Sequence, residues 1–514
     1  MRPPARLAAL ATCLLSIGIV ATAAGAQITG GNSGASVTRD QPTTTTAPST
    51  SNGVQHLKFS YGPLDIEPGQ NQIEISDGRL DQPKVDGWIV GFRPDLKLKD
   101  GTTPPVDQIH LHHGVWANDA RDDRTSPQFP ERFIAAGEEK TALELPDGYA
   151  YPYQRTDRWF LNYMIHNLTA TPFKVSITYD VDFIPATSAA AKNLHAAYPV
   201  WLDVENGSLY PVFDVHKGSG TNGTFTFPSD DPNAYAGGAA KNQWVVDQPG
   251  VLIHTFGHLH PGGLRVDFAL RRPSNGNATA HLFESTAKYY EPAGAVSWDV
   301  SMTATQPDWK VAVQPGDVLS ISATYDTSRA SWYESMGLGI VWMANQSGVG
   351  ADPFTTKVDQ AGELTHGHLP ENDNHGGKKT TLKNPRLAKD GKPTQLLAMS
   401  NFLYSAGDLT AGGPIPTVAQ GSSITFENQD ADPLSVWHSV TSCKAPCTKS
   451  TGVAYPLADS DVQFDSGQLG DAGPPTTGEL TWNTPADLAP GTYTYFCRVH
   501  PFMRGAFRVV VDTK

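Results

Sequence analysis

One short segment near the C-terminus combines a thiol, an imidazole and a thioether, three side chains that bind soft metal ions. Cys497, His500 and Met503 lie within seven residues, between two strand-like runs. A loop between strands can fold these side chains around one ion, and His438 can supply a fourth ligand from upstream. Two His, one Cys and a weakly bound Met form the ligand set of an electron-transfer copper site, because soft sulfur ligands suit both Cu(I) and Cu(II). The alternative is a buried Cys and a core Met that coincide with two His.

A group of closely spaced histidines lies in the first third of the chain. In the run His110-Leu-His112-His113, the alternation of side chains along a strand predicts two imidazoles on one face and the third on the other. His166 ends a strand-like run and could meet them in space. A lone His in such strands would be a core or surface residue, but imidazole clusters are typical ligands of Zn or Cu.

A second group combines two histidines with a methionine. His258-Leu-His260 again places two imidazoles on one strand face and is followed by a turn. Met336 opens an apolar run further along the chain. We interpret these residues as a further candidate metal site.

The elements that must position these residues are predominantly β-strands. With 514 residues, the chain fits about three domains, on a prior of roughly 100–200 residues per domain. It holds 48 Gly and 40 Pro, and charged residues make up 18%, so turns interrupt it frequently. Short β-branched and aromatic runs alternate with these turns, and no block contains a long stretch of helical period. The predicted ordered units are 55–190, 191–348 and 391–514, with a polar linker at 349–390.

The N-terminal segment predicts export. Residues 1–26 carry two Arg, an apolar run and an Ala-Gly-Ala signal-peptidase pattern, so the mature chain is expected to begin near Gln27. A lipoprotein anchor is the weaker alternative, because Cys13 lies inside the apolar run rather than after it. Residues 27–54 are rich in Thr, Ser and Gly and predict a disordered tether. We therefore expect a secreted, periplasmic or cell-surface protein.

Charge and cysteine content narrow the partners. The formal net charge is −14 and no long basic cluster occurs, so nucleic acid is a poor partner. After the signal peptide no stretch of about 20 apolar residues predicts a membrane span. Cys443 and Cys447 are expected to form a local disulfide in an exported protein, with two free thiols or a metal pair as the alternatives.

The C-terminal block resembles the cupredoxins. Its Cys-x-x-His-x-x-Met spacing and its Pro-Phe-Met-Arg-Gly text are most similar to the amicyanin-like members. The resemblance covers about 110 residues and implies a Greek-key β-sandwich with one type 1 copper. The ligands that it implies are His438, Cys497, His500 and Met503.

The order of the upstream motifs resembles the copper type II, ascorbate-dependent monooxygenases, the group of peptidylglycine α-hydroxylating monooxygenase and dopamine β-monooxygenase. This resemblance spans about 290 residues and implies two jelly-roll β-sandwiches, each holding one type 2-like mononuclear copper. It implies that the first copper is bound by His112, His113 and His166. It implies that the second copper, the catalytic one, is bound by His258, His260 and Met336.

The chain departs from that group in three respects. Residues 27–442 contain no Cys, whereas the animal members are held together by disulfides. Phe256 occupies the position of the arginine that grips a peptide carboxylate. Leu338 and Ile340 replace an Asn and a Tyr that follow the Met ligand. A glycine-extended peptide is therefore an unexpected substrate, and a more apolar pocket is predicted.

The two resemblances together imply an exported, O2-dependent copper monooxygenase that hydroxylates a small, rather apolar molecule. The Met-containing site would be where O2 and substrate meet, and the three-His site would supply the second electron. One oxygen atom would enter the substrate and the other would leave as water. The fused type 1 copper unit would relay electrons from an external donor.

Three alternatives remain open. A multicopper oxidase shares the His-x-His pairs, but there the copper-binding Cys is flanked by His, and here Cys497 is flanked by Phe496 and Arg498. A lytic polysaccharide monooxygenase needs an N-terminal His, and Gln27 argues against it. A non-catalytic exported copper protein that passes electrons to or from a partner is the alternative from another class.

Three histidines of the polar linker receive a different interpretation. They lie in a Gly-containing, polar stretch, which favours a solvated linker over a fourth metal site, with copper capture as the alternative. These residues are His366, His368 and His375.

Overall fold

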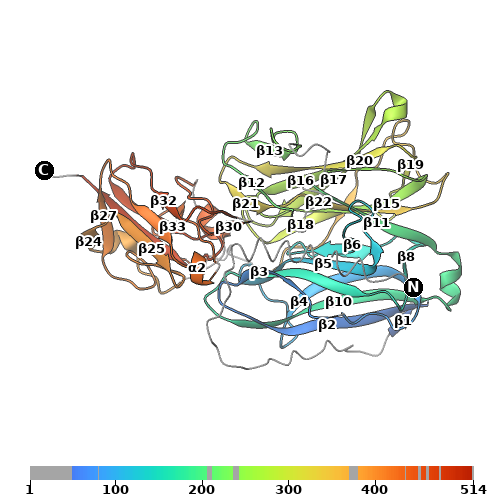
Figure 1. Cartoon of the computed structure of the whole chain (residues 1–514), viewed down its shortest axis with the longest axis horizontal. Helices are drawn as coiled ribbons and strands as arrows, with labels where there is room; N and C mark the ends of the chain where they lie inside the picture. The colour runs from blue at the N-terminus through green and yellow to red at the C-terminus, as the bar shows by residue number, and fades with distance from the viewer. Residues whose placement is uncertain are drawn as a thin grey trace.

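The computed structural model describes most of the chain as β-strands, which confirms the predicted all-β class. The described residues are 49–51, 53–78, 80–204, 211–235, 242–369, 380–434, 436–449, 453–458, 462–473 and 476–511. The predicted signal peptide and most of the predicted tether lie outside them, as does His375. Within these residues no helix is long and apolar enough to cross a membrane. The strands form three sandwiches that follow one another along the chain (Figure 1).

The first sandwich consists of two sheets packed face to face. The outer sheet contains, from edge to edge, β1 (Ser49–Ser51), β2 (Val54–Ile66), β10 (Phe173–Pro185), β4 (Gly87–Leu98) and the short β7 (Leu143–Glu144) and β8 (Tyr149–Tyr153). The inner sheet contains β3 (Asn71–Ile75), β9 (Trp159–Asn167), β5 (Ile109–Asp122) and β6 (Pro130–Ala136). Phe92 on β4 contacts Trp116 and Trp159 of the inner sheet, so the apolar core lies between the two sheets.

The second sandwich is built in the same way. One sheet contains β11 (His195–Asp203), β22 (Leu338–Ala344), β15 (Gly250–His258), β18 (Val300–Thr305) and β19 (Val311–Val313). The facing sheet contains β13 (Thr224–Phe227), β14 (Gln243–Val245), β20 (Val318–Asp326), β16 (Gly263–Arg272) and β17 (Ala278–Tyr289). A separate pair, β12 (Phe213–Val215) and β21 (Trp332–Ser335), precedes Met336. Two short 3-10 turns complete this half of the chain, at Ala189–Asn193 and Pro273–Asn275.

The third sandwich also has two sheets. The first contains β24 (Asp390–Pro393), β27 (Ile415–Ala419), β34 (Arg504–Val510), β33 (Gly491–Phe496) and β29 (Thr441–Cys443). The second contains β26 (Leu403–Tyr404), β25 (Leu396–Ser400), β28 (Thr425–Asn428) and β32 (Thr481–Asn483). Short elements between them are α2 (Ala431–Leu434), α3 (Ala454–Ala458), β30 (Ala472–Gly473) and β31 (Thr476–Thr477).

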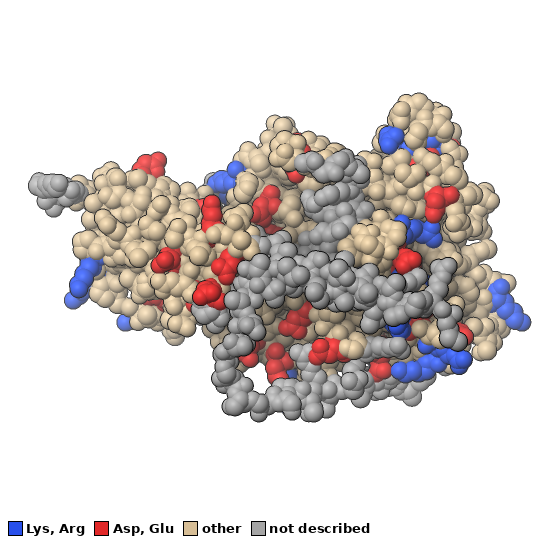
Figure 2. Space-filling view, viewed as in Figure 1, with Lys and Arg blue, Asp and Glu red and all other residues tan. Residues whose placement is uncertain are grey.

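The first two sandwiches are packed against each other through their histidine-bearing sheets. Phe256 on β15 and Ile340 and Trp342 on β22 belong to the same buried cluster as the core of the first sandwich. β8 also pairs in parallel with the start of β11. The third sandwich lies at one end, beside both of the others (Figure 1). Acidic side chains gather around this junction on the face shown in Figure 2.

Part of the segment expected to be a polar linker is structured. β23 (Gly362–Leu364) pairs with β18 and extends the second sandwich, and Pro385–Leu387 forms a 3-10 turn before β24. Polar composition did not indicate this strand, because its three residues are all exposed and it is fixed to the sheet by its pairing with β18 rather than by a buried apolar side chain.

Candidate metal centres

Three ligand atoms converge inside the third sandwich. The His438 and His500 Nδ1 atoms lie 3.1 Å apart, and the Cys497 Sγ atom lies 3.8 Å from the first and 3.6 Å from the second. All three side chains are buried. Atoms at these separations can bind one ion together, as the ligand types predicted.

The loop between β33 and β34 holds this arrangement in place. The Cys497 N–H donates to the Met503 carbonyl at 3.3 Å, and the Met503 N–H donates to the His500 carbonyl at 2.8 Å. Met503 is buried in the same loop. His438 Nε2–H donates to the Asp430 carboxylate at 2.9 Å, which leaves Nδ1 facing the other ligands. The Ser439 N–H donates to Cys497 Sγ at 3.3 Å.

The electrostatics favour a thiolate at this site. Burial alone raises the pKa of Cys497, but the hydrogen bond and charge of His438 outweigh it and lower that pKa below its ordinary value. Burial lowers the pKa of His438, but the hydrogen bonds that its ring makes to Asp430 and Cys497 raise it to about 8. The metal-free site therefore favours an imidazolium beside a thiolate, and the thiolate is the form that binds metal.

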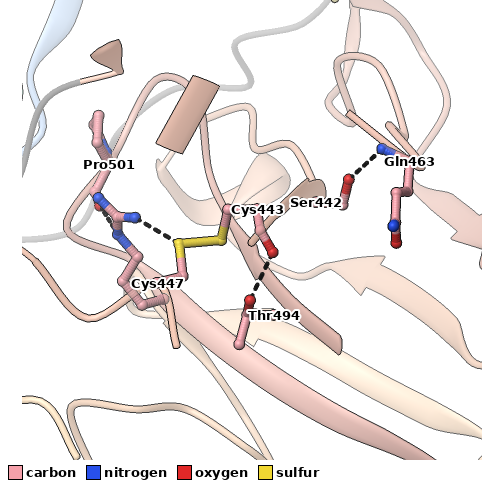
Figure 3. Close-up of a disulfide and its surroundings, with 7 residues drawn as sticks. Ser442, Cys443, Cys447, Gln463, Thr494 and Pro501 are labelled. Carbon is pink, nitrogen blue, oxygen red and sulfur yellow. Dashed lines mark hydrogen bonds between the residues drawn. A yellow bond between two sulfur atoms is a disulfide. The ribbon is translucent and has the colours of Figure 1, made fainter. Parts of the chain in front are cut away.

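The predicted disulfide lies beside the loop 497–503, which we call the copper loop after the ion that its residues are predicted to bind. Cys443 and Cys447 are joined at an S–S distance of 2.09 Å (Figure 3). Thr494 on β33 donates to the Cys443 carbonyl at 2.7 Å. The buried Arg504 contacts Cys447 Sγ at 3.0 Å and donates to the Pro501 carbonyl at 2.6 Å, so it links the disulfide to the loop.

A β-bulge at His112 arranges the upstream histidines. The pairing of β5 with β9 shifts between Leu111 and His113, which leaves His112 as the extra residue. Leu111 and Trp116 both enter the core of the first sandwich although they lie an odd number of residues apart. His113 therefore points out of that core, on the side of His110. The expectation that one of these imidazoles faces the opposite side of the strand was wrong, because simple alternation ends at the bulge.

Three of these imidazoles form a cluster at the outer face of the inner sheet. The ligand nitrogens of His110, His112 and His166 all lie within 4.8 Å of one another. His110 and His166 are direct cross-strand partners on β5 and β9. His260 of the second sandwich joins them, with its ring centroid 4.2 Å from that of His112.

The nitrogens in this cluster are in the state that a metal ion requires. His110 Nδ1–H donates to the Val106 carbonyl and His260 Nδ1–H to the Glu334 carbonyl, which leaves each Nε2 facing inward. Among the described residues, no hydrogen-bond partner is found for these two Nε2 atoms, for His166 Nδ1 or for either nitrogen of His112. Burial holds the pKa of the four imidazoles below the ordinary value, that of His166 at about 4. Buried neutral imidazoles fit a copper ion.

Three of the remaining predicted ligands, His113, His258 and Met336, lie away from this cluster and next to a different cavity. His113, His258 and Met336 line one pocket between the first two sandwiches. His258 Nδ1 lies 3.0 Å from a Glu139 carboxylate oxygen. Burial, together with the His258 charge, lowers the pKa of His113 to about 3. This pocket is otherwise lined mainly by apolar side chains, which include Phe129, Phe160, Trp201 and Leu338.

The structure therefore groups the predicted ligands across the boundary between the sandwiches. His112 is close to His166, its predicted partner, and also to His260, which was predicted to bind the other copper. His113 and His258, which were predicted to bind different coppers, line the same pocket. The assignment of separate trios to each sandwich stays a prediction. The packing of the two histidine-bearing sheets brings the two groups together into one continuous region.

Sequence analysis missed two carboxylates and one histidine in this region. Glu138 is buried within 4.8 Å of the His112 and His260 nitrogens, and burial together with Glu139 raises its pKa well above the ordinary value. Glu139 is held by the Gly137 N–H at 3.0 Å and the Thr141 hydroxyl at 3.0 Å. The sequence feature that could have indicated these two carboxylates is their position as an adjacent acidic pair, separated by one residue from the end of the apolar strand β6. The missed histidine is His110, which belongs to the same run as His112 and His113 and whose ligand nitrogen lies in the cluster with those of His112 and His166.

Gly137 is required for the close approach of these groups. A Cβ at Gly137 would lie 2.6 Å from the His112 carbonyl and 3.0 Å from His258 Cε1. Gly137→Ala is therefore expected to separate the two sheets locally and to lower the copper content of the purified protein, measured by metal analysis. Gly367→Ala is the matched control, since nothing lies within 4 Å of the added methyl group there. Full copper content in Gly137→Ala would contradict this account of the packing.

His254 on β15 provides a pH-dependent prediction. Burial lowers its pKa to about 4. Between the unfolded value of about 6.5 and this folded value, the unfolded chain binds a proton that the folded chain does not, so stability falls as the pH falls. The metal-free protein should therefore lose unfolding free energy when the pH is lowered from about 7 to about 4.5. In the His254→Gln variant we expect this loss to be smaller by about 2–3 kcal/mol. The exposed His281→Gln is the control, and an equal pH dependence in both variants would refute the prediction.

The two described linker histidines are bound to other groups. His366 Nε2–H donates to the Val300 carbonyl at 2.8 Å. His368 Nδ1 pairs with the Asp299 carboxylate at 2.7 Å. They do not converge on a common point with other ligands among the described residues.

Comparisons with known proteins find weak similarity to several copper proteins. No protein-family profile matches the chain. It is 24% identical over 282 residues to probable copper-dependent oxygenase M1 of Phoma sp., which covers 53% of this chain and 66% of that protein. It is 24% identical over 243 residues to probable copper-dependent oxygenase clz3 of Cochliobolus lunatus, which covers 46% of this chain and 70% of that protein. The chain thus spans just under two thirds of the first relative.

Two solved copper proteins are also similar to parts of the chain. A copper(I) form of a mutant amicyanin matches 25% of this chain and 91% of its own length, with 20% identity and a TM-score of 0.15. A copper-containing nitrite reductase from Thermus scotoductus matches 52% of this chain and 58% of its own length, with 14% identity and a TM-score of 0.15. At the level of sequence, the chain is therefore weakly similar to two proteins described as probable copper-dependent oxygenases.

Proposed function

We propose that this protein is a copper-dependent oxygenase that hydroxylates a small, apolar molecule and receives its electrons through its third sandwich. The observation that carries this proposal is the apolar pocket that opens directly onto His113, His258 and Met336. Copper bound there would supply one-electron redox chemistry and O2 binding, and a thioether beside imidazoles would favour its Cu(I) state. The weak similarity to copper-dependent oxygenases agrees with this assignment.

The pocket wall itself favours an uncharged substrate. Arg132 is the cationic side chain among the described lining residues, and its charge is already paired with Asp123 at 2.8 Å and Asp203 at 3.7 Å. One of its nitrogens, Nη2, has no hydrogen-bond partner among the described residues. If Nη2 becomes accessible when a substrate binds, Arg132 would donate a hydrogen bond to its carbonyl or hydroxyl, while the apolar wall would exclude water from the C–H group that reacts.

The decisive experiment is oxygen incorporation by the copper-loaded protein. A panel of neutral, apolar compounds would be incubated with the protein, ascorbate and isotopically labelled O2, and the products analysed by mass spectrometry. One labelled oxygen atom in a product, with substrate-stimulated O2 uptake, supports the proposal. If the protein takes up copper and exchanges electrons but no compound stimulates O2 uptake, the non-catalytic electron-transfer function is favoured instead.

We also propose that the protein is exported, on the strength of the N-terminal pattern alone. Mass spectrometry of the protein from its native host should then show a mature chain that begins near Gln27. An intact N-terminus on protein recovered from inside the cell would contradict export.

A further inference from the structure

Three successive residues of the copper loop contact the other two sandwiches. Arg498 donates to the Ser331 carbonyl of the second sandwich at 2.6 Å. The Val499 carbonyl accepts a hydrogen bond from His166 Nε2 of the first sandwich at 2.8 Å. The ring of His500 donates from Nε2 to the Gly69 carbonyl at 3.0 Å. The loop is thus held at the junction of all three units.

The contact between Val499 and His166 joins the two candidate copper centres directly. Val499 precedes His500, whose Nδ1 lies 3.6 Å from Cys497 Sγ. On the other side, His166 uses Nε2 for the Val499 carbonyl, while its Nδ1 faces His110 and His112. One imidazole ring therefore contacts the copper loop with one nitrogen and the histidine cluster with the other.

The contact between the His500 ring and the Gly69 carbonyl positions the loop but does not lead to another candidate metal site among the described residues. Gly69 lies in the turn between β2 and β3, where no candidate ligand lies within its neighbouring residues. Its φ is +68°, and an added Cβ would lie 2.8 Å from His500 Cδ2. Gly69 therefore permits close docking of the His500 ring, but this contact leads to no second metal site.

We propose that the His500 backbone, the Val499 carbonyl and the His166 ring form the electron path from the Cys497 copper to the copper of the His110–His112–His166 cluster. This proposal rests on the copper occupancy assumed under the proposed function, but not on hydroxylation. If both sites hold copper, an external one-electron reductant such as ascorbate would reduce the ion held by Cys497. One electron would then pass along this path, so that the Cys497 site would return from Cu(I) to Cu(II) and the histidine cluster would change from Cu(II) to Cu(I). No covalent bond or proton changes place.

A groove between the three sandwiches makes the path accessible to experiment. His166 lines this groove together with His112, His260, Trp298 and Val499. A small heterocycle can therefore reach the space left by a truncated His166 side chain. This access allows the hydrogen bond to Val499 to be removed while a nitrogen ligand is kept.

The test uses the full-length, copper-loaded His166→Gly variant with two exogenous ligands. Imidazole offers a copper ligand and an N–H donor for the Val499 carbonyl, whereas 1-methylimidazole offers the ligand alone. The Cys497 copper is reduced rapidly, and the return of its blue absorption reports electron transfer to the cluster. EPR spectra verify that both ligands restore copper to the cluster.

We expect imidazole to restore electron transfer to near the wild-type rate, and 1-methylimidazole to leave it clearly slower, because the hydrogen bond to the Val499 carbonyl is missing. Equal rates with the two ligands, when both restore the EPR signal, would overturn the proposed path. Absence of electron transfer in the fully copper-loaded wild type would overturn it as well. Neither result depends on whether any compound is hydroxylated, so a failed oxygenase assay would leave this test intact.

A second variant decides the matter if His166→Gly does not fold or does not rebind copper. Arg498 holds the loop against the second sandwich through Ser331 and stacks over the Trp332 ring at 5.1 Å. Arg498→Ala should loosen the loop and slow electron transfer while the blue absorption keeps its position. Arg508→Ala is the matched control, because this arginine of β34 contacts Thr492 and Asp390 within the third sandwich itself. An unchanged rate in Arg498→Ala would overturn the proposal.

Discussion

Replacing Cys497 with Ser is expected to abolish the intense blue absorption of the copper-loaded protein and most of its substrate-dependent O2 uptake. The Cys497 sulfur is buried beside His438 and His500, and the lowered pKa of its thiol favours the thiolate ligand. A hydroxyl of similar size keeps the packing but is a poor ligand for Cu(I). Absorption spectra, EPR and O2 electrode measurements check this prediction.

The control for Cys497→Ser is the copper of the histidine cluster. Because this cluster is built by β5, β9 and the turn after β15, its EPR signal should survive the substitution. A folded Cys497→Ser variant that turns over substrate as fast as the wild type, with every reductant tried, would show that the third sandwich supplies no electrons.

The second large effect is expected at His258. His258→Ala removes a candidate ligand at the wall of the apolar pocket, so copper binding at that wall and substrate-dependent O2 uptake should both be lost. Glu139 contacts the other side of this imidazole at 3.0 Å. Glu139→Gln should therefore have a smaller effect, with copper affinity weakened by about 10–100-fold, as is typical when a group that orients a ligand is changed.

Copper titration and O2 uptake would be compared for both variants and for His281→Ala, an exposed histidine on β17. The expected order of effect is His258→Ala, then Glu139→Gln, with His281→Ala near the wild type. If His258→Ala retained full copper content and turnover, the apolar pocket would not be the reaction site. If Glu139→Gln were as severe as His258→Ala, the carboxylate would bind the metal itself.

The convergence of Cys497, His500 and His438 on one point was predictable from sequence because most of its determinants are local. Cys497, His500 and Met503 lie in one loop between two strands, so their spacing already constrains their separation in space. His438 was identified by completing the ligand set, and the structure places it where the set requires. The disulfide was predictable for the same reason, because Cys443 and Cys447 are separated by only a short turn.

The histidine cluster was only partly predictable because two of its features are not local. The bulge at His112 adds one residue to a strand, and nothing in the residue types marks it, so the alternation of side chains was extended through it incorrectly. The approach of His260 to His112 depends on how two sheets pack, which no sequence window records. Glu138 and Glu139 were overlooked because acidic residues are usually exposed, and only a tertiary site buries them together.

The docking of the copper loop also has a consequence for maturation. The His500 ring, one wall of the site around Cys497, is covered by the turn that contains Gly69. If copper enters past this ring, its uptake by the folded, metal-free chain should be slow and limited by transient opening of the junction. We then expect copper to load fast only while the third sandwich has not yet docked.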